Sequence, residues 1–289
     1  MTICITCSVS GIGVGFTEKL RKAGGMKSFE GKRILITGGA HGIGLALAKR
    51  YAALHAVVII LDINTEALKV ASEKLPEVRF FRVDITNKDE VYKTAQTIRE
   101  TLGTPSIIVN NAGVVENATF LDCEDDLLER TMKVNILSHF WILKAFLPEM
   151  IKAREGHICE IASAAGIVGV PGMAAYCASK HAVVGFAHSL QLELQAMAGN
   201  AISLTLICPS FINTGLFKGA KPPMFTSILD ENKIAEIIFK AIESKKFIVY
   251  EPFAVKLIPI LRGVLPHSLF YWVLRLLRVN QSMKEISHL

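Results

Sequence analysis

The sequence predicts one α/β domain: a doubly wound, parallel, seven-stranded sheet of the Rossmann type with helices on both faces. Short apolar runs alternate with stretches of helical periodicity from Arg33 to Tyr250, which is typical of repeated β-α-β units. A chain of 289 residues, 51% of them hydrophobic, is long and apolar enough to bury one sizeable core. A glycine-rich turn joins the first apolar run to the first helical stretch, as the fold requires.

Seven apolar runs are predicted as strands, and helices fill the gaps between them. The strands are expected at residues 33–37, 57–62, 78–83, 106–110, 156–162, 202–207 and 247–250. The two longest helices are expected near residues 124–150 and 174–198. Neither an internal repeat nor a long low-complexity linker interrupts the sequence, so one domain accounts for the pattern.

The glycine-rich turn after the first strand indicates a phosphate-binding loop. Gly38, Gly42 and Gly44 permit a tight turn and let a pyrophosphate approach the backbone at a helix N-terminus. The second apolar strand ends at Asp62, whose carboxylate can accept hydrogen bonds from a ribose 2′-hydroxyl and would repel a 2′-phosphate. No arginine or lysine occurs within residues 39–41 of the turn. The sequence therefore predicts NAD as the cofactor rather than NADP.

A tyrosine and a lysine with helical spacing indicate acid–base chemistry. Tyr176 and Lys180 stand four residues apart and share a helix face, and Ser163 lies thirteen residues before the tyrosine. A lysine ammonium beside a phenol favours the phenolate and lowers its pKa from about 10. Such a tyrosine can exchange a proton with a substrate oxygen, to which a nearby serine hydroxyl can also hydrogen-bond. This equipment predicts interconversion of an alcohol and a carbonyl.

Together these motifs resemble the short-chain dehydrogenase/reductase family over about residues 28 to 250. The resemblance is carried by Thr37-Gly38-x-x-x-Gly42-x-Gly44, by Asn110-Asn111-Ala112-Gly113, by Asn135, Ser163, Tyr176 and Lys180, and by Pro209 with Ile212 and Thr214. Within the family, the stretches "DINTEAL" and "INTGLF" look most similar to the membrane- and lipid-droplet-associated 17β-hydroxysteroid dehydrogenases and to the epidermal-type retinol dehydrogenases.

The resemblance implies a role for each matching residue. The implied catalytic residues are Asn135, Ser163, Tyr176 and Lys180. The implied cofactor-binding residues are Gly38, His41, Gly42, Ile43, Gly44, Asp62, Asp84, Ile85, Asn111, Ala112, Gly113, Tyr176, Lys180, Pro209, Ile212 and Thr214. Asp84 is expected to bind the adenine amino group, with a strand-end cap as the alternative. Asn135 is expected to kink its helix and hold a water that links Lys180 to solvent, with a buried hydrogen bond to the backbone as the alternative.

Three residues depart from the family's pattern. Ser210 follows Pro209 where glycine is common, and can alter the turn beside the nicotinamide. His55 replaces a glycine at the end of the first helix and must adopt a cap conformation that suits glycine better. Glu160 lies inside the strand that leads to Ser163, where a buried charge needs a partner, a shifted pKa or a cavity to face.

Charge and cysteine content exclude several classes of function. The net charge is +6, but no clustered basic stripe with aromatic residues is evident, so nucleic acid is not an expected partner. The six cysteines follow no secretory signal and are expected to be free thiols in a reducing compartment. Cys4 and Cys7 form half a metal site at most, so no metal is expected.

The two ends of the chain are set apart from the catalytic domain. Residues 1–27 are expected to form an irregular extension, residues 28–250 the dinucleotide-binding catalytic domain, and residues 251–289 an apolar, basic C-terminal segment. The first sixteen residues are too short and too rich in Ser, Thr and Gly for a spanning helix. The segment 252–279 contains three prolines and four basic residues, which favours an interfacial position in a lipid headgroup layer. A lid over the substrate site or a dimer contact are the alternatives.

With the resemblance, the sequence predicts an NAD-dependent oxidoreductase that interconverts a lipophilic alcohol and its carbonyl by hydride transfer. The alcohol is expected to be a steroid, a retinoid or a long-chain alcohol, because the apolar loop 215–230 lies where the family has its substrate loop. The resemblance also implies a homodimer and a location at the cytoplasmic face of the endoplasmic reticulum or on lipid droplets, with a soluble cytoplasmic protein as the alternative. A non-catalytic lipid-surface scaffold of the same fold is the competing hypothesis.

Overall fold

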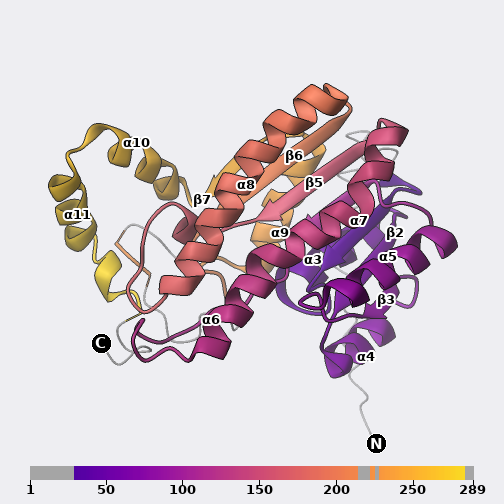
Figure 1. The fold of residues 1–289 in the computed structure, drawn as a ribbon, viewed down its shortest axis with the longest axis horizontal. Helices are drawn as coiled ribbons and strands as arrows, with labels where there is room; N and C mark the ends of the chain where they lie inside the picture. The colour runs from indigo at the N-terminus through magenta and orange to yellow at the C-terminus, as the bar shows by residue number, and fades with distance from the viewer. Residues whose placement is uncertain (1–28, 214–221, 225–227, 284–289) are drawn as a thin grey trace, which may run out of the picture.

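A seven-stranded, all-parallel sheet forms the centre of the molecule, in the order β3-β2-β1-β4-β5-β6-β7 (Figure 1). The computed structural model describes residues 29–213, 222–224 and 228–283. The strands are β1 (Arg33–Thr37), β2 (Val57–Asp62), β3 (Arg79–Arg82), β4 (Ile107–Asn110), β5 (Gly156–Ile161), β6 (Ile202–Pro209) and β7 (Ile248–Glu251). The main helices are α3 (Gly42–Ala52), α4 (Thr65–Lys74), α5 (Lys88–Thr101), α6 (Asp125–Met132), α7 (Ser138–Ala153), α8 (Ala174–Ala198), α9 (Glu231–Glu243), α10 (Leu257–Val264) and α11 (His267–Leu276). The predicted fold class is confirmed.

The central strands are buried on both faces, which explains their near-continuous apolar sequences. Every residue of β4 is buried, and in β1 and β2 only the first residue is partly exposed. All seven predicted strands are confirmed, and the largest difference is the end of β6, which extends to Pro209. Burial on both sides makes such a strand easy to recognise as a short apolar run.

Two helical layers cover the sheet. Ile34 and Ile36 of β1 face the core shared with α3 and α9, whereas Leu35 faces the core shared with α5, α7 and α8. On the first side, the rings of Phe29, Tyr51 and Phe239 lie with centroids 5.1 to 5.4 Å apart and join α3 to α9. The loops at the carboxyl ends of the strands are thus held on a rigid scaffold.

Three of the helices begin at side-chain caps that the sequence supplies locally. Asn64 accepts a hydrogen bond from the N–H of Ala67 at the start of α4. Asn87 and Asp230 do the same for α5 and α9, each with two backbone N–H groups. Such caps satisfy backbone donors that the first helical turn leaves unpaired.

The long helix expected near residues 124–150 is interrupted. A π-helical turn over Lys133–Leu137 separates α6 from α7, with Asn135 at its centre. The kink implied for Asn135 is therefore present. The helix expected at 174–198 has the same bounds in α8. After α3, His55 adopts the left-handed conformation expected for it, with φ of +59°.

The C-terminal helices α10 and α11 form a lobe beyond the sheet (Figure 1). Phe270, Leu274 and Val279 of this lobe pack against Val168, in the segment between β5 and α8. No helix in the described part of the chain is long and apolar enough to span a membrane. The extension predicted over residues 1–27 lies outside the described residues.

Candidate active site

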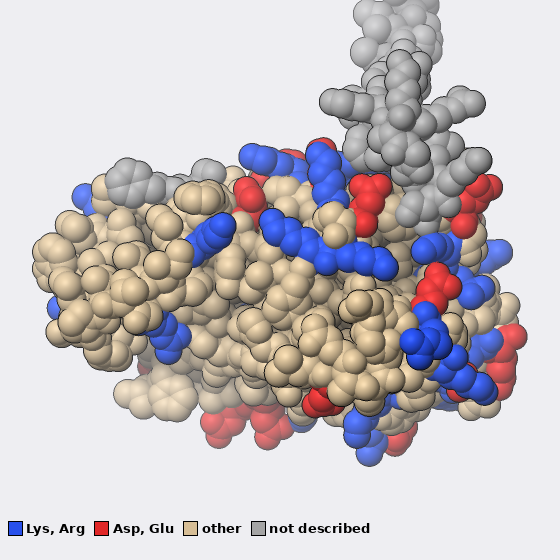
Figure 2. Space-filling model, turned by 90° about the horizontal axis from the view of Figure 1, so that it is seen from above, with Lys and Arg blue, Asp and Glu red and all other residues tan. Residues whose placement is uncertain are grey.

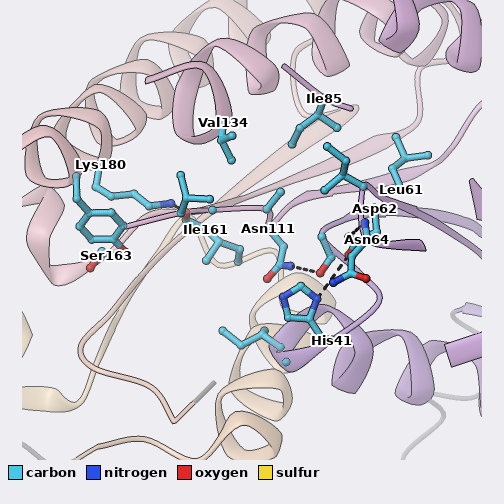
Figure 3. A pocket seen from close by; sticks show the side chains of 18 of the residues that line it. His41, Leu61, Asp62, Asn64, Ile85, Asn111, Val134, Ile161, Ser163 and Lys180 are labelled. Carbon is cyan, nitrogen blue, oxygen red and sulfur yellow. Dashed lines mark hydrogen bonds and ion pairs between the residues drawn. The ribbon is translucent and has the colours of Figure 1, made fainter. Parts of the chain in front are cut away.

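One cleft of about 730 Å³ runs along the carboxyl ends of the central strands, where parallel α/β sheets bind their ligands. Figure 3 shows His41, Asp62 and Asn64 at one end of it and Ser163 and Lys180 at the other. The candidate residues that line the cleft are Gly38, His41, Gly42, Ile43, Asp62, Asp84, Ile85, Asn111, Ala112, Gly113, Ser163, Tyr176, Lys180, Pro209 and Ile212. The fold thus brings motifs from distant parts of the sequence into one site.

Three candidate residues are placed differently. Gly44 and Asn135 do not line the cleft but support residues that do, and Thr214 lies outside the described residues. The sequence analysis did not single out ten other lining residues, most of which flank strand ends: Leu61, Ile63, Asn64, Val83, Thr86, Val114, Arg130, Val134, Ile161 and Ala162. Their position after or within the predicted strands was the available signal, except for Arg130 on α6 and Val134 in the π-helical turn, which had none.

The glycine-rich turn is too tightly packed for side chains. Gly38 has φ of +60°, and a Cβ added there would lie 2.9 Å from the Cα of Ala112. A Cβ on Gly44 would lie 2.5 Å from the carbonyl oxygen of Gly38 and 2.8 Å from Asn111 Nδ2. The first turn of α3 therefore packs directly beneath the loop, and its backbone is left open to a phosphate.

Asn111 braces that loop from β4. Its Nδ2 donates to the carbonyl oxygens of Thr37 and Gly38, at 2.9 and 3.0 Å. In return, Thr37 Oγ1 accepts the backbone N–H groups of Asn111 and Ala112, at 3.0 and 3.1 Å. Asn111 thus fixes the geometry of the glycine-rich turn while it also lines the cleft.

Asp62 is held as a buried carboxylate at the end of β2. It accepts the N–H groups of Ala40 and Asn64, at 3.1 and 3.0 Å, and His41 Nδ1 lies 3.6 Å from its Oδ2. Burial alone would raise the pKa of Asp62, but the hydrogen bonds from His41, Asn64 and Ala40 outweigh it and lower the pKa. The hydrogen bond with Asp62 in turn raises the pKa of His41. The structure therefore ties His41 to Asp62.

Asp84 forms a local turn after β3 and also lines the cleft. Its Oδ1 accepts the backbone N–H and the hydroxyl of Thr86, at 2.9 and 2.7 Å, which is the local capping arrangement. The residue also lines the cleft beside Ile85. Binding of an adenine amino group by Asp84 stays a prediction.

Ser163, Tyr176 and Lys180 lie buried at the other end of the cleft. Lys180 Nζ is 5.8 Å from the centroid of the Tyr176 ring, so amine and ring share one face of α8 as expected. Lys180 Nζ donates to the carbonyl oxygen of Ile161 at 2.8 Å. Ser163 follows β5, and its Oγ accepts the N–H of Ala165 at 3.1 Å.

The pKa of Tyr176 differs from the expectation. Burial raises it well above the usual value near 10, and a hydrogen bond with Ser163 opposes this rise only in part. Burial also lowers the pKa of Lys180 to about 8. The expected lowering of the tyrosine pKa was therefore wrong for the protein without ligands, because spacing along a helix reveals a neighbouring charge but not the loss of water around the phenol.

Asn135 forms buried hydrogen bonds to the backbone, which was the alternative expectation for this residue. Its Oδ1 accepts the N–H of Val114 at 2.9 Å, and its Nδ2 donates to the Val114 carbonyl oxygen at 2.9 Å and to Ser179 Oγ at 3.0 Å. These bonds fix the chain that follows Gly113 against α8. A water-mediated link from Asn135 to Lys180 stays a prediction.

The sequence analysis missed Glu116, a buried carboxylate at the start of α8. Its Oε1 accepts the backbone N–H of Tyr176 at 2.6 Å. The helix has no side-chain cap from Met173, so this distant carboxylate satisfies a free N–H in its first turn. Sixty residues separate the pair, and no local pattern connects them.

A second, apolar cavity of about 100 Å³ adjoins the cleft at Ser163 and Ser210. Its other walls come from the segment after β5, from the chain after β6 and from the C-terminal lobe: Ala164, Ala165, Val168, Val170, Met173, Phe211, Pro223, Met224, Ala254, Val255, Ile258, Leu274, Leu277, Val279 and Ser282. The lobe therefore covers this cavity in the manner of a lid, one of the arrangements considered for residues 251–289.

The cysteines of the described residues are buried. Cys123, Cys159, Cys177 and Cys208 are free thiols, and Cys177 Sγ accepts the backbone N–H of Val170 at 3.4 Å. No group of three or more potential metal ligands occurs in the described ranges. Cys4 and Cys7 lie outside them.

Comparison with solved structures supports the same overall fold. A short chain dehydrogenase/reductase from Burkholderia phymatum, crystallised in complex with NAD, matches with a TM-score of 0.75 and 27% identity, over 81% of this chain and 94% of that one. A short-chain dehydrogenase from Streptomyces avermitilis has the same fold, with a TM-score of 0.72 and 23% identity over 84% of this chain and 96% of that one.

Comparison with known sequences places the chain more closely. Epidermal retinol dehydrogenase 2 of Mus musculus is 40% identical over 247 residues, which cover 83% of this chain and 80% of the relative. Estradiol 17-beta-dehydrogenase 11 of Homo sapiens is 36% identical over 270 residues, 92% of this chain and 88% of the relative. The family model for short chain dehydrogenases matches residues 32–224. The chain therefore belongs to the short-chain dehydrogenase/reductase family.

Proposed function

We propose that this protein is an NAD-dependent dehydrogenase of a lipophilic alcohol, such as a steroid, a retinoid or a long-chain alcohol. The observation that carries the proposal is the apolar cavity that meets the cleft at Ser163. A hydroxyl placed at this junction reaches the buried serine and tyrosine, while an adjoining part of an apolar molecule enters the cavity. The similarity to retinol and estradiol dehydrogenases supports the same class of substrate.

The residues along the cleft fit a dinucleotide. Gly38 and Gly42 line the cleft, so the backbone of the glycine-rich turn can approach a pyrophosphate there, and a Cβ at Gly38 or Gly44 would displace that backbone. The Asp62 carboxylate, kept ionised by its hydrogen bonds, suits a ribose with a free 2′-hydroxyl. Ile85, Gly113 and Ile212 line the length between the two ends. When bound, NAD supplies a nicotinamide that accepts a hydride from the alcohol carbon.

Side chains of the protein then accept the proton of the substrate hydroxyl. Ser163 and Tyr176 bind the substrate hydroxyl, and the ionised oxygen of Tyr176 accepts its proton as the carbon is oxidised. Because burial opposes ionisation of the phenol, Tyr176 depends on the positive charge of Lys180 beside it. Asn111 and Asn135 keep the glycine-rich turn and the chain after Gly113 in place.

A spectrophotometric assay tests the proposal directly. Purified protein incubated with NAD and either retinol, oestradiol or a long-chain alcohol is expected to produce NADH with at least one of them. With NADP, kcat/KM should be at least about tenfold lower than with NAD. Repulsion of about 1.4 kcal/mol between Asp62 and the 2′-phosphate corresponds to that factor. If none of the alcohols yields NADH and the protein binds tightly to lipid vesicles, the results would favour the non-catalytic scaffold. A preference for NADP would refute the assigned cofactor.

We further propose that the outer face of the C-terminal lobe binds an anionic lipid surface, such as the endoplasmic reticulum or a lipid droplet. Trp272, Val264 and Leu276 are exposed on this lobe, at 59%, 71% and 61%. Figure 2 shows the lobe, at the left, as a mostly uncharged surface with basic side chains at its margin. Residues 252–283 include four basic and no acidic residues, which complements a negative surface.

Vesicle co-sedimentation tests this contact. The Trp272→Glu variant is expected to bind vesicles of phosphatidylcholine and phosphatidylserine about tenfold more weakly, because it replaces an exposed aromatic by a like-charged group at the lipid. Val70→Glu, on α4 far from the lobe, is the matched control and should bind like the unmodified protein. Equal binding by all three proteins, or none by any, would contradict the proposal. Dimer formation, implied by the family resemblance, stays a prediction.

A further inference from the structure

A buried carboxylate lies beneath the catalytic end of the cleft. Glu160, in the middle of the sheet on β5, is fully buried. Its Oε1 accepts a hydrogen bond from Asn110 Nδ2 at 2.7 Å, and its Oε2 lies 2.5 Å from Nδ1 of His139 on α7. The unusual charge noted in this strand therefore has two partners, both also buried.

The hydrogen-bond pattern indicates which of these groups is charged. The amide of Asn110 donates to one carboxylate oxygen, and His139 can donate to the other through Nδ1. His139 Nε2 is buried without a hydrogen-bond partner among the described residues. A neutral imidazole leaves only a lone pair unsatisfied there, whereas an imidazolium would bury an unpaired charged N–H. The arrangement therefore favours a negative Glu160 beside a neutral His139.

Lys180 is a cation on which the negative charge of Glu160 acts. Its Nζ donates to the carbonyl oxygen of Ile161, the residue that follows Glu160 on β5 (Figure 3). Burial lowers the pKa of Lys180 to about 8, and the negative charge of Glu160 opposes that lowering. From β6, Cys208 also faces the lysine, but burial raises the pKa of this thiol to about 12, so it is neutral near pH 7. Burial likewise raises the pKa of Tyr176 on α8 itself. Within the described residues, Glu160 is thus the full negative charge that acts on Lys180 at neutral pH.

We propose that Glu160 is a positioning residue that keeps Lys180 protonated, with Asn110 and His139 holding its carboxylate in place. This role rests on the proposed dehydrogenase function, in which the lysine charge permits Tyr176 to ionise. A group whose pKa has been lowered to about 8 carries its charge below that pH and loses it as the pH rises through 8. Without Glu160 the charge would be lost at a lower pH, closer to neutrality.

The titration of Lys180 tests this without any cofactor. Glu160→Gln is nearly isosteric: its amide oxygen can still accept from His139 Nδ1, and its NH2 group can donate to Asn110 Oδ1 once the Asn110 amide turns over. NMR of lysine-labelled protein, with the Lys180 signal assigned by its absence in Lys180→Arg, should show the pKa of Lys180 fall by about 1 pH unit in Glu160→Gln. Glu160→Asp keeps the charge but shortens the side chain, and it should titrate close to the unmodified protein. A purely structural role predicts the reverse order, with Asp the more disturbed variant.

The pH dependence of turnover provides the second reading. The alkaline limb of kcat/KM should move down by about 1 pH unit in Glu160→Gln, while near pH 6 the variant should retain activity within about twofold. If Glu160→Gln does not fold, Glu160→Thr offers a second neutral side chain suited to a buried strand. An unchanged Lys180 titration in a folded neutral variant would overturn the role of Glu160. Inactivity of the unmodified protein towards every alcohol would instead overturn the proposed function, and the NMR titration would still decide the role of Glu160.

Discussion

Replacement of Tyr176 by phenylalanine is expected to lower kcat/KM for alcohol oxidation by about 10³-fold. The substitution removes one oxygen, the atom that accepts the substrate proton, and leaves an apolar ring in a site that is already buried. Among the described residues that line this end of the cleft, Tyr176 is the titratable hydroxyl with an ammonium group beside it, that of Lys180. Steady-state NADH production measures the loss.

Binding of NAD separates a catalytic defect from a folding defect in this variant. Tyr176→Phe should bind NAD within about threefold of the unmodified protein, because the glycine-rich turn and Asp62 lie at the other end of the cleft. Tyr250→Phe on β7 removes an equivalent oxygen outside both cavities and should leave turnover unchanged. Near-normal oxidation by Tyr176→Phe would contradict the assigned proton acceptor.

The fold was predictable because its central strands are buried on both faces. Each of these strands appears in the sequence as an apolar run, and burial fixes its length more firmly than local propensity does. The division of the long helix into α6 and α7 was not recognised from periodicity, because the π-helical turn at Lys133–Leu137 adds only one residue to one turn of a long apolar stretch. Only the resemblance to the family indicated a kink at Asn135.

The site was predictable where its residues follow strand ends and less so where tertiary contacts decide. Asp62 is the last residue of β2 and Ser163 follows β5 closely, so their position at one edge of the sheet follows from topology. Glu116 reaches the start of α8 from sixty residues away, and His139 approaches Glu160 from another helix. Neither pair has a local sequence signal. The prediction of a lowered pKa for Tyr176 was wrong for the same reason, since burial is a property of the whole fold.

For the C-terminal segment, the two expected arrangements do not exclude each other: a lid over the substrate site and an interfacial position at a lipid surface. Its inner face closes the apolar cavity through Ile258 and Leu274, as a lid would. Its outer face leaves Trp272 and Val264 exposed, as an interfacial segment would. Apolar composition and scattered basic residues are common to both interpretations, so sequence alone could not separate the two faces of one pair of short helices.

Replacement of Gly44 by alanine is expected to weaken NAD binding by about 100-fold and to lower the free energy of unfolding by about 2 kcal/mol. The added Cβ would lie 2.5 Å from the Gly38 carbonyl oxygen and 2.8 Å from the Gly39 Cα, so backbone rather than a flexible side chain must shift. Any such shift moves the loop that is open to the pyrophosphate and strains the two hydrogen bonds from Asn111 Nδ2. Isothermal titration with NAD and thermal unfolding measure the two effects.

Gly185→Ala is the matched control, because it adds the same methyl group to a helix at a site with no atom within 4 Å. Alanine is the better helix former, so this variant should be as stable as the unmodified protein or up to about 1 kcal/mol more stable, with unchanged NAD binding. The comparison separates the effect of a methyl group from the effect of its position. If Gly44→Ala bound NAD as tightly as Gly185→Ala does, close packing beneath the loop would not be what opens its backbone to the cofactor, and the dinucleotide site would have to rest on Asp62 and the rest of the cleft.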